Sequence, residues 1–282
     1  MNRLFLAVIV IPLIGFACTE NRQISEHRQS VAGDTTISSA ATATEPDRPL
    51  PKQWRLKVVR TLPHDKTCYT QGLEIHDGAM YETGGLVGRS TLRKIDMSTW
   101  KSLQTVKLPA EVFGEGLTLF DAKIYTLTWR DERCLIYSAN NLNLIGETNY
   151  TGEGWGLCND GESLIMTNGS NTITFLDPKD FRIRRIVSVF DNGRPVSELN
   201  EAEYIDGEIW ANIYQSNNIV RINPQTGDIL GWIDAAGLLS EADITAGAEV
   251  LNGIAYDSAT KSVYLTGKLW PKLFEVKLEQ LK

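Results

Sequence analysis

Short runs that alternate apolar and polar residues, separated by Asp-Gly-type turns, dominate the chain from about Trp54 onward. Runs of this length and period predict β-strands. Helical periodicity is almost absent, apart from a short turn around Leu238 to Ile244. The pattern therefore predicts an all-β fold.

One phrase recurs along the chain: a short strand, an Asp-containing hairpin turn, and a second strand rich in Tyr, Ile and Trp. Its five copies open with Gln71-Gly72-Leu73, Glu115-Gly116-Leu117, Trp155-Gly156-Leu157, Glu201-Ala202-Glu203 and Asn252-Gly253-Ile254. The second residues of these copies lie 44, 40, 46 and 51 positions apart. That spacing is typical of one four-stranded blade of a β-propeller.

The remaining strands of each unit follow the phrase. Third strands are predicted at Ser90 to Asp96, Cys134 to Ser138, Thr172 to Asp177, Ile219 to Asn223 and Leu273 to Lys277. Fourth strands are predicted at Ser102 to Leu108, Leu144 to Thr148, Arg184 to Val189 and Ile229 to Ile233. The fifth unit lacks one, and Trp54 to Leu62, ahead of the first unit, has the same character. We therefore predict a five-bladed β-propeller in which the N-terminal strand closes the last blade.

The first residues have the features of an export signal. Arg3 precedes an apolar run from Leu4 to Ile14, which is too short to span a bilayer, and Ala17 precedes Cys18. Residues 1–17 are predicted to be a signal peptide of the lipoprotein type, with Cys18 lipidated. Gly15 stands where such signals usually carry Leu, so ordinary cleavage before Cys18 stays open. Either form predicts an exported protein, periplasmic or on the outer surface, with a lipid anchor as its contact with the membrane.

Residues 18–52 are rich in Ser, Thr, Ala and Pro and have no apolar period, so we predict a flexible linker. Residues 53–282 are predicted to form the folded domain, with a monomer as the default state. The 28 basic residues are outnumbered by 35 acidic ones and form no stripe, which makes nucleic acid an unlikely partner on physical grounds. Only His64 and His76 lie beyond residue 52, which is too few for a tri-histidine zinc centre. Three cysteines beyond residue 52 allow at most one disulfide among them.

The repeat also locates a candidate site, because the innermost strands of a propeller converge on its central channel. The residues that precede the repeated small residue should face the channel mouth: Gln71, Glu115, Trp155, Glu201 and Asn252. They offer amides, carboxylates and an indole where a purely structural role would favour small or β-branched residues. An equally open interpretation is that they bind only water or a structural cation such as calcium.

Several strings together resemble the plant and bacterial type of glutaminyl-peptide cyclotransferase. They are Tyr69-Thr70-Gln71-Gly72-Leu73, Phe113-Gly114-Glu115-Gly116-Leu117-Thr118, Gly154-Trp155-Gly156-Leu157, Glu198-Leu199-Asn200-Glu201, Asn252-Gly253-Ile254-Ala255-Tyr256-Asp257 and Thr266-Gly267-Lys268-Leu269-Trp270-Pro271-Lys272. The resemblance runs from about residue 58 to 278 and touches all five units in order. It implies a five-bladed propeller that converts the N-terminal glutamine of peptides or proteins to pyroglutamate and releases ammonia. It also implies catalysis without the zinc of the animal enzymes and with no other catalytic cofactor.

The resemblance further implies roles for individual residues. Glu115 matches the family's acidic position and would shuttle a proton from the attacking amine to the leaving nitrogen. Gln71 and Asn200 would direct N–H groups at the amide oxygen, where negative charge develops. Lys268 would donate a hydrogen bond or a proton to the leaving amine. These four residues are the predicted catalytic set.

Aromatic walls suit this reaction, because the glutamine side chain must fold back onto its own amine. Trp155 matches a pocket tryptophan of the family, whereas Tyr214 stands where the family usually has another tryptophan. Tyr69 and Trp129 are predicted as additional substrate-binding walls. Asn168 replaces a usual Asp before Gly-Ser and is interpreted as a difference in a blade turn. His64 either lines the rim or has a structural role in its loop.

Two other functions stay open at this point. One is a calcium-dependent, lactonase-like propeller hydrolase, with Glu115, Asn200, Glu203 and Asn252 as oxygen ligands. Against it, a tryptophan and a glutamine at two of the five central positions are poorly suited to a hard cation. The other is a binding propeller with no catalytic activity. Activity on a dipeptide that starts with glutamine, unaffected by a chelator, would separate the cyclotransferase from both.

Overall fold

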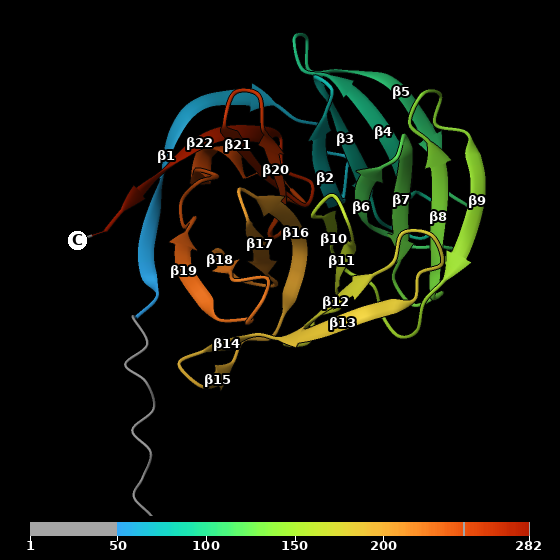
Figure 1. Cartoon of the computed structure of the whole chain (residues 1–282). Coiled ribbons are helices and arrows are strands. Elements are labelled where there is room, and N and C mark those ends of the chain that lie inside the picture. The colour runs from blue at the N-terminus through green and yellow to red at the C-terminus, as the bar shows by residue number, and fades with distance from the viewer. Residues whose placement is uncertain (1–49, 245, 282) are drawn as a thin grey trace, which may run out of the picture. The chain divides into compact units, whose positions relative to one another are not determined.

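The computed structural model describes residues 50–244 and 246–281 (Figure 1). Within these residues the regular structure is β, with one 3₁₀ turn, η1 (Glu241–Asp243), inside the segment predicted to turn. The prediction of an all-β fold is confirmed. The predicted signal peptide and most of the predicted linker lie outside the described residues. None of the helical structure in the described part of the chain is long and apolar enough to cross a membrane.

Most strands belong to antiparallel units of four. Unit 1 contains β2 (Thr70–His76), β3 (Ala79–Gly84), β4 (Thr91–Asp96) and β5 (Lys101–Lys107). Unit 2 contains β6 (Gly114–Phe120), β7 (Lys123–Thr128), β8 (Arg133–Ser138) and β9 (Leu144–Asn149). Unit 3 contains β10 (Leu157–Asn159), β11 (Leu164–Thr167), β12 (Thr172–Leu176) and β13 (Ile183–Ser188). The third and fourth strands of these units begin and end within one residue of the predicted limits.

Units 4 and 5 join into one eight-stranded sheet. Unit 4 contains β16 (Leu199–Ile205), β17 (Glu208–Ile213), β18 (Asn218–Ile222) and β19 (Ile229–Asp234). Unit 5 contains β20 (Leu251–Asp257), β21 (Ser262–Gly267), β22 (Lys272–Gln280) and β1 (Lys52–Pro63). The N-terminal strand β1 pairs with β22 in antiparallel fashion, as the sequence predicts, and its first residues also pair in parallel with β19. A small hairpin, β14 (Phe190–Asp191) and β15 (Arg194–Pro195), was not predicted.

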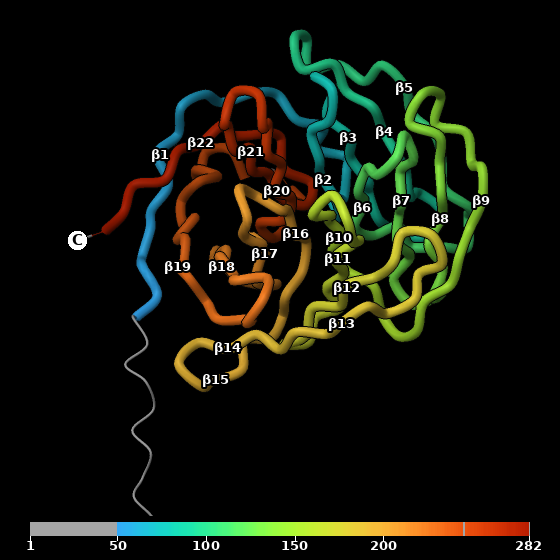
Figure 2. Tube along the Cα trace, in the orientation of Figure 1, coloured from blue at the N-terminus to red at the C-terminus, as the bar shows by residue number. Residues whose placement is uncertain are grey.

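The first strands of the five units contact one another in a cycle: β2 with β6, β6 with β10, β10 with β16, β16 with β20, and β20 with β2. Figure 2 shows these strands in the middle of the trace, whereas β1, β5, β9 and β13 lie at its periphery. Each unit therefore runs outward from a shared centre, and the last unit returns to the first.

Apolar side chains hold neighbouring units together. Each of the five core clusters combines residues from two adjacent units, and the last combines unit 5 with unit 1. Successive residues of a strand point to opposite faces, so Ile124 packs toward unit 1 whereas Tyr125, the next residue, packs toward unit 3. Burial of each such side chain contributes roughly 1.5–3 kcal/mol. Cys68, Cys134 and Cys158 are buried free thiols, and Cys134 and Cys158 belong to these clusters.

Irregular pairing at the start of the inner strands prepares the site. The registers of β2, β6, β16 and β20 with their neighbours shift within the first few residues of each strand. A β-bulge leaves residues out of the regular alternation and re-aims their side chains. Residues near the start of these strands can therefore face the mouth of the central space.

Candidate active site

A cavity of about 190 Å³ lies where the inner strands begin. Its lining consists of Tyr69, Gln71, Phe113, Glu115, Trp129, Trp155, Asn200, Tyr214 and Lys268. The structure thus brings all eight predicted site residues together, from all five units, in one cavity. Phe113 is the one lining residue that the sequence analysis did not assign to the site.

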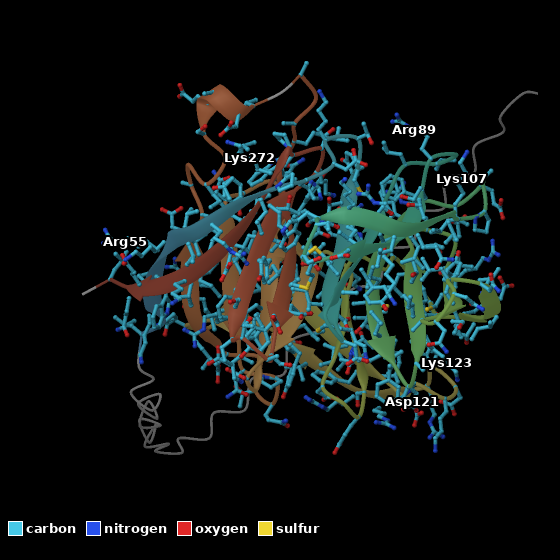
Figure 3. All side chains as sticks on the ribbon, turned by 90° about the horizontal axis from the view of Figure 1, so that it is seen from above. Arg55, Arg89, Lys107, Asp121, Lys123 and Lys272 are labelled. Atoms are coloured by element: carbon cyan, nitrogen blue, oxygen red, sulfur yellow. The ribbon has the colours of Figure 1, made fainter. Side chains whose placement is uncertain are left out.

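The strand ends explain why residues far apart in sequence meet here. Gln71, Glu115 and Asn200 are second residues of β2, β6 and β16, whereas Trp129 and Tyr214 directly follow β7 and β17. Starts of first strands and ends of second strands lie at the same end of each antiparallel hairpin. The hairpin turns lie at the opposite end, as Figure 3 shows for Asp121 and Lys123, away from Arg89 and Lys272.

Two residues predicted to face the mouth do not line it. Glu201 points inward, where its carboxylate accepts the backbone N–H groups of Leu73 and Ile254 at 3.1 and 2.8 Å. In the bulge of β16 it is the preceding residue, Asn200, that lines the cavity. The prediction for Glu201 was wrong because the repeat in this unit was aligned one residue too late. Asn200, not Glu201, is the second residue of its strand, as Glu115 is of β6.

Asn252, the second exception, orients a residue that does line the cavity. Its Nδ2 donates to the backbone oxygen of Thr70 at 2.9 Å and to Oε1 of Gln71 at 3.2 Å. Because the Gln71 oxygen is occupied in this way, the Nε2 group of Gln71 is the end of its amide available to the cavity. The repeat predicted that Asn252 faces the mouth, but in the structure Asn252 orients Gln71 and does not line the cavity.

Glu115 is the buried acid of the cavity, with 4% of its surface exposed. Loss of hydration raises its pKa well above the ordinary range, the nearby Lys268 ammonium acts in the opposite direction, and Glu153 raises it further. No described residue donates a hydrogen bond to its carboxyl group. Its oxygens therefore remain available to a molecule in the cavity.

Lys268 brings the positive charge. Burial lowers the pKa of Lys268 to about 8, although Glu115 and Glu249 act to raise it. Its Nζ lies 4.8 Å from the centre of the Tyr69 ring and 5.2 Å from that of Tyr214. The electron-rich faces of these rings favour the ammonium and hold it between two walls of the cavity.

One carboxylate fixes two tryptophan walls. Oε2 of Glu153 accepts the indole N–H groups of Trp129 and Trp155 at 2.8 and 3.0 Å, and its Oε1 accepts a hydrogen bond from Arg130 at 2.9 Å. The hydrogen bonds from Trp155 and Trp129 lower the pKa of Glu153, which keeps it ionised. Trp155 also meets Tyr214 edge to face, with ring centres 5.5 Å apart. These contacts fix the orientation of the indoles.

The opposite wall is fixed by a second carboxylate. The hydroxyl of Tyr69 donates to Oε2 of Glu249 at 2.7 Å, and burial raises the pKa of Tyr69, so the phenol stays protonated. Phe113 packs edge to face on Tyr69 and tilts against Trp129, with ring centres 6.1 and 5.6 Å away. Phe113 thereby joins the two halves of the aromatic lining.

Gly169 makes room for the Trp155 ring. A Cβ at Gly169 would lie 2.7 Å from that ring, and its φ of +79° is one that residues with side chains rarely adopt. The neighbouring Asn168 accepts hydrogen bonds from the backbone and hydroxyl of Ser170, at 3.2 and 2.6 Å. Asn168 thus builds the turn beneath the cavity wall and is absent from the lining, in agreement with its interpretation as a turn residue.

His64 does not line the cavity. Its Nδ1 lies 2.7 Å from the backbone oxygen of Trp270 and its Nε2 lies 2.8 Å from Glu82. Glu82 and the peptide oxygen together raise the pKa of His64 against the effect of burial. Of the two interpretations of His64, the structural one agrees with these contacts.

The four proposed calcium ligands do not converge. Glu115 and Asn200 line the cavity, whereas Glu203 accepts the backbone N–H of Tyr256 at 3.1 Å and Asn252 supports Gln71. Within the described part of the chain, no group of three or more His, Cys, Asp or Glu residues is arranged to hold a metal ion. The cavity instead combines one carboxyl, one ammonium, two amides and a largely aromatic wall.

Sequence reasoning missed Phe113, Glu153 and Glu249. Phe113 is the first residue of one recognised string, two positions before Glu115, and Glu153 directly precedes another, two positions before Trp155. Their closeness to Glu115 and Trp155 in the sequence could have identified them as candidate site residues. Glu249 lies in an irregular connection, and nothing in the pattern indicated that it reaches Tyr69.

Comparisons with known proteins agree with the geometry. The family model described as glutamine cyclotransferase matches residues 31–278. The glutaminyl-peptide cyclotransferase of Arabidopsis thaliana is 40% identical over 232 residues, covering 80% of this chain and 72% of that protein. The crystal structure of Myxococcus xanthus glutaminyl cyclase superposes with a TM-score of 0.77 at 34% identity, covering 82% of this chain and all of that one. This chain belongs to the glutamine cyclotransferase family, and the family predicted from the sequence is confirmed.

Proposed function

We propose that this chain acts on peptides and proteins that begin with glutamine, closes the glutamine to pyroglutamate and releases ammonia. The observation that supports this most is the single cavity that joins a hydrogen-bond-free carboxyl, Glu115, to an ammonium, Lys268, inside aromatic walls. Both reacting groups belong to one residue of the substrate. A small, enclosed cavity therefore suffices to fold the side chain back onto its amine.

Glu115 is proposed as the proton shuttle. The α-amine nitrogen of the substrate attacks its own side-chain amide carbon, a new C–N bond forms, and the bond to the amide nitrogen breaks. The amine must lose a proton and the leaving nitrogen must gain one to depart as ammonia. The raised pKa of Glu115 brings its basicity closer to that of the amine, so one carboxyl can accept the proton and return it.

The polar side chains around Glu115 are proposed to stabilise the charge that develops on the amide oxygen. Gln71, with its oxygen held by Asn252, and Asn200 can both present N–H groups. Lys268, protonated below its pKa of about 8, can donate a third hydrogen bond to the reacting amide. Tyr69, Trp129, Trp155 and Tyr214 are proposed to hold the substrate side chain in its folded form.

We propose that the five units are the blades of a five-bladed propeller, with β1 closing the last blade. The cyclic contacts of the five inner strands support this arrangement, as do the five core clusters between neighbouring units. The pairing of β1 with β22 supports the closure.

Catalysis is proposed to need no metal ion. The ammonium and the aromatic rings that line the cavity with Glu115 are poor ligands for a hard cation, which prefers a site lined by oxygen atoms. The test is ammonia release from a glutaminyl dipeptide amide by the purified chain, before and after dialysis against EDTA. We expect unchanged turnover, even where removal of a structural calcium lowers the melting temperature. Loss of activity that returns with calcium or zinc would favour the lactonase-like alternative, and no activity under either condition would favour a binding propeller.

Export is a further proposal, which the sequence alone supports. The apolar run from Leu4 to Ile14, followed by Ala17 and Cys18, would send the chain out of the cytoplasm, with Cys18 carrying a lipid. Replacing Cys18 with Ala should release the mature protein from the membrane fraction. A protein found in the soluble fraction with and without that change would indicate ordinary cleavage. We propose a monomer as the working state.

A further inference from the structure

A second groove lies at the same end of the molecule as the candidate active site. It has a volume of about 220 Å³, and its apolar wall comes from Leu238, Leu239, Ile244 and Ala248. These residues belong to the connection from β19 to β20, which runs from 235 to 250 and is described at 235–244 and 246–250. The corresponding connections from β5 to β6 and from β9 to β10 cover only 108–113 and 150–156. The extra length explains why the last spacing of the sequence repeat is the longest.

Polar contacts tie this connection to unit 5. Asp243 accepts a hydrogen bond from Ser240 at 2.6 Å and pairs with Lys272 at 2.5 Å. Trp270, at the back of the groove, donates its indole N–H to the backbone oxygen of Glu249 at 2.8 Å. These contacts hold the groove wall in position, and its apolar side chains are accompanied by the polar groups of Asn217 and Glu249.

The groove and the cavity are immediate neighbours. Tyr69 lines the cavity and Glu249 lines the groove, and their side chains are joined by the 2.7 Å hydrogen bond. In the turn after β21, Lys268 faces the cavity and Trp270 the groove. The hydrogen bond between Tyr69 and Glu249 thus links the lining of the cavity to the lining of the groove.

We propose that this groove binds the side chain of the residue that follows the N-terminal glutamine, and that it favours an apolar side chain there. The inference rests on the proposed function. Cyclisation keeps both reacting groups within the first residue, so the second residue must leave the cavity at its mouth. Its Cα lies only 3.8 Å from that of the glutamine, which is within reach of a groove whose lining is hydrogen-bonded to that of the cavity.

The groove offers little to an acidic or very small second residue. Its apolar surface gains from covering an aliphatic or aromatic side chain, whereas the exposed Glu249 carboxylate at its edge repels an acidic one. We therefore expect peptides with Leu or Phe at the second position to be preferred over those with Gly, and those with Gly to be preferred over those with Asp.

The test measures kcat/KM for ammonia release from Gln-Leu-amide, Gln-Gly-amide and Gln-Asp-amide. Amides are used so that no C-terminal carboxylate lies near Glu249, which leaves the Asp side chain as the only carboxylate among the three substrates. The unchanged chain should prefer Gln-Leu-amide to Gln-Gly-amide by about tenfold, the lower end of the range for discrimination by an apolar pocket. The variant Ile244→Asn should reduce this preference at least threefold, with kcat/KM for Gln-Gly-amide unchanged. Ile244 is 58% exposed, so the substitution should leave the fold intact.

Ile145→Asn is the matched control, because Ile145 is 54% exposed on β9 and lies outside both spaces. It should keep the full preference for Leu. A second variant, Ala248→Leu, fills part of the groove and should lower kcat/KM for Gln-Leu-amide more than for Gln-Gly-amide. Equal preferences in the unchanged chain, Ile244→Asn and Ala248→Leu would overturn the inference while leaving the proposed function intact. Absence of activity on all three peptides would overturn the proposed function, and the inference with it.

Discussion

Two of the regions that contain buried carboxylates differ in what surrounds the acid. Between the inner strands, Glu74 accepts hydrogen bonds from the hydroxyl of Thr118 at 2.7 Å and the backbone N–H of Leu119, and Glu201 and Glu203 accept backbone N–H groups of neighbouring strands. In the cavity, Glu115 is equally buried and accepts no hydrogen bond from a described residue.

The comparison shows that burial alone does not mark a catalytic acid. Burial raises the pKa of both kinds of carboxyl, to about 7 for Glu74 and well above the ordinary range for Glu201, Glu203 and Glu115. The interior carboxyls use their oxygens to join adjacent units. Glu115 is dehydrated to the same extent but joins no units through hydrogen bonds among the described residues, which is typical of a group that takes part in catalysis.

Among the residues around Glu115, the largest effect is expected at Lys268, which carries the positive charge of the cavity. Lys268→Ala should lower kcat by about two to four orders of magnitude, because it removes the proposed donor to the reacting amide. Lys268→Arg should retain partial activity, since guanidinium keeps its charge but has another shape.

The pH dependence of kcat/KM provides the second readout for Lys268. The attacking amine loses its proton near pH 7.7–8.0, which raises the rate, whereas Lys268 loses its proton above its pKa of about 8, which lowers it. The profile should therefore peak near pH 8, and Lys268→Arg should move the alkaline limb upward. If Lys268→Ala lost stability but kept the activity and pH profile of the unchanged chain, Lys268 would only be a structural residue.

A smaller effect is expected at Glu153, which holds two walls but lies outside the lining. Glu153→Gln removes the charge that accepts both indole N–H groups, so the tryptophans should lose their fixed orientation. We expect KM for a glutaminyl dipeptide amide to rise about tenfold, the cost of one charge-assisted hydrogen bond, with a lesser change in kcat. Glu147→Gln, at a carboxylate that pairs with Arg133 on the outer strands, is the control. Equal KM values for the two variants would remove Glu153 from the positioning of the walls.

The smallest effect concerns stability at Glu74. Because its pKa is raised to about 7 in the folded chain, the folded state binds more protons than the unfolded state between pH 4.5 and 7. The contribution of Glu74 to stability is therefore lost as the pH rises through that range. Glu74→Gln mimics the protonated form. The melting temperature of the variant minus that of the unchanged chain should therefore increase as the pH rises from 5 to 7. A constant difference across that range would contradict the raised pKa.

Much of the architecture was predictable because strands have a strict period and their turns have recognisable residues. The limits of β12, β18 and the other third and fourth strands follow from alternation, except that β22 continues to Gln280, beyond its predicted end at Lys277. The pairing partner of β1 follows from the missing strand of unit 5. The hairpin β14–β15 escaped prediction, because two-residue strands are too short to show a period.

Site residues could be predicted where they lie in recognisable local strings of sequence. They could not be predicted where tertiary contacts determine the direction of a side chain. Gln71, Glu115 and Trp155 precede the repeated glycine and do line the cavity. Glu201 and Asn252 were aligned with the same position and do not line the cavity. Asn200 takes that position in β16, and Asn252 is held by its hydrogen bonds to Thr70 and Gln71. Glu249 reaches Tyr69 across 180 positions of sequence, a contact that no local pattern encodes.

Glu115 and Glu201 are both buried, but we assign a catalytic role to Glu115 and a structural role to Glu201. The most direct test of this assignment measures kcat and melting temperature for Glu115→Gln and Glu201→Gln side by side. Glu115→Gln should lower kcat by about two to four orders of magnitude with the melting temperature nearly unchanged. Glu201→Gln should lose several degrees of melting temperature, because it weakens hydrogen bonds to Leu73 and Ile254, and should retain kcat. Turnover of Glu115→Gln within about threefold of the unchanged chain, below even the weakest contribution expected of a general acid–base group, would contradict the account.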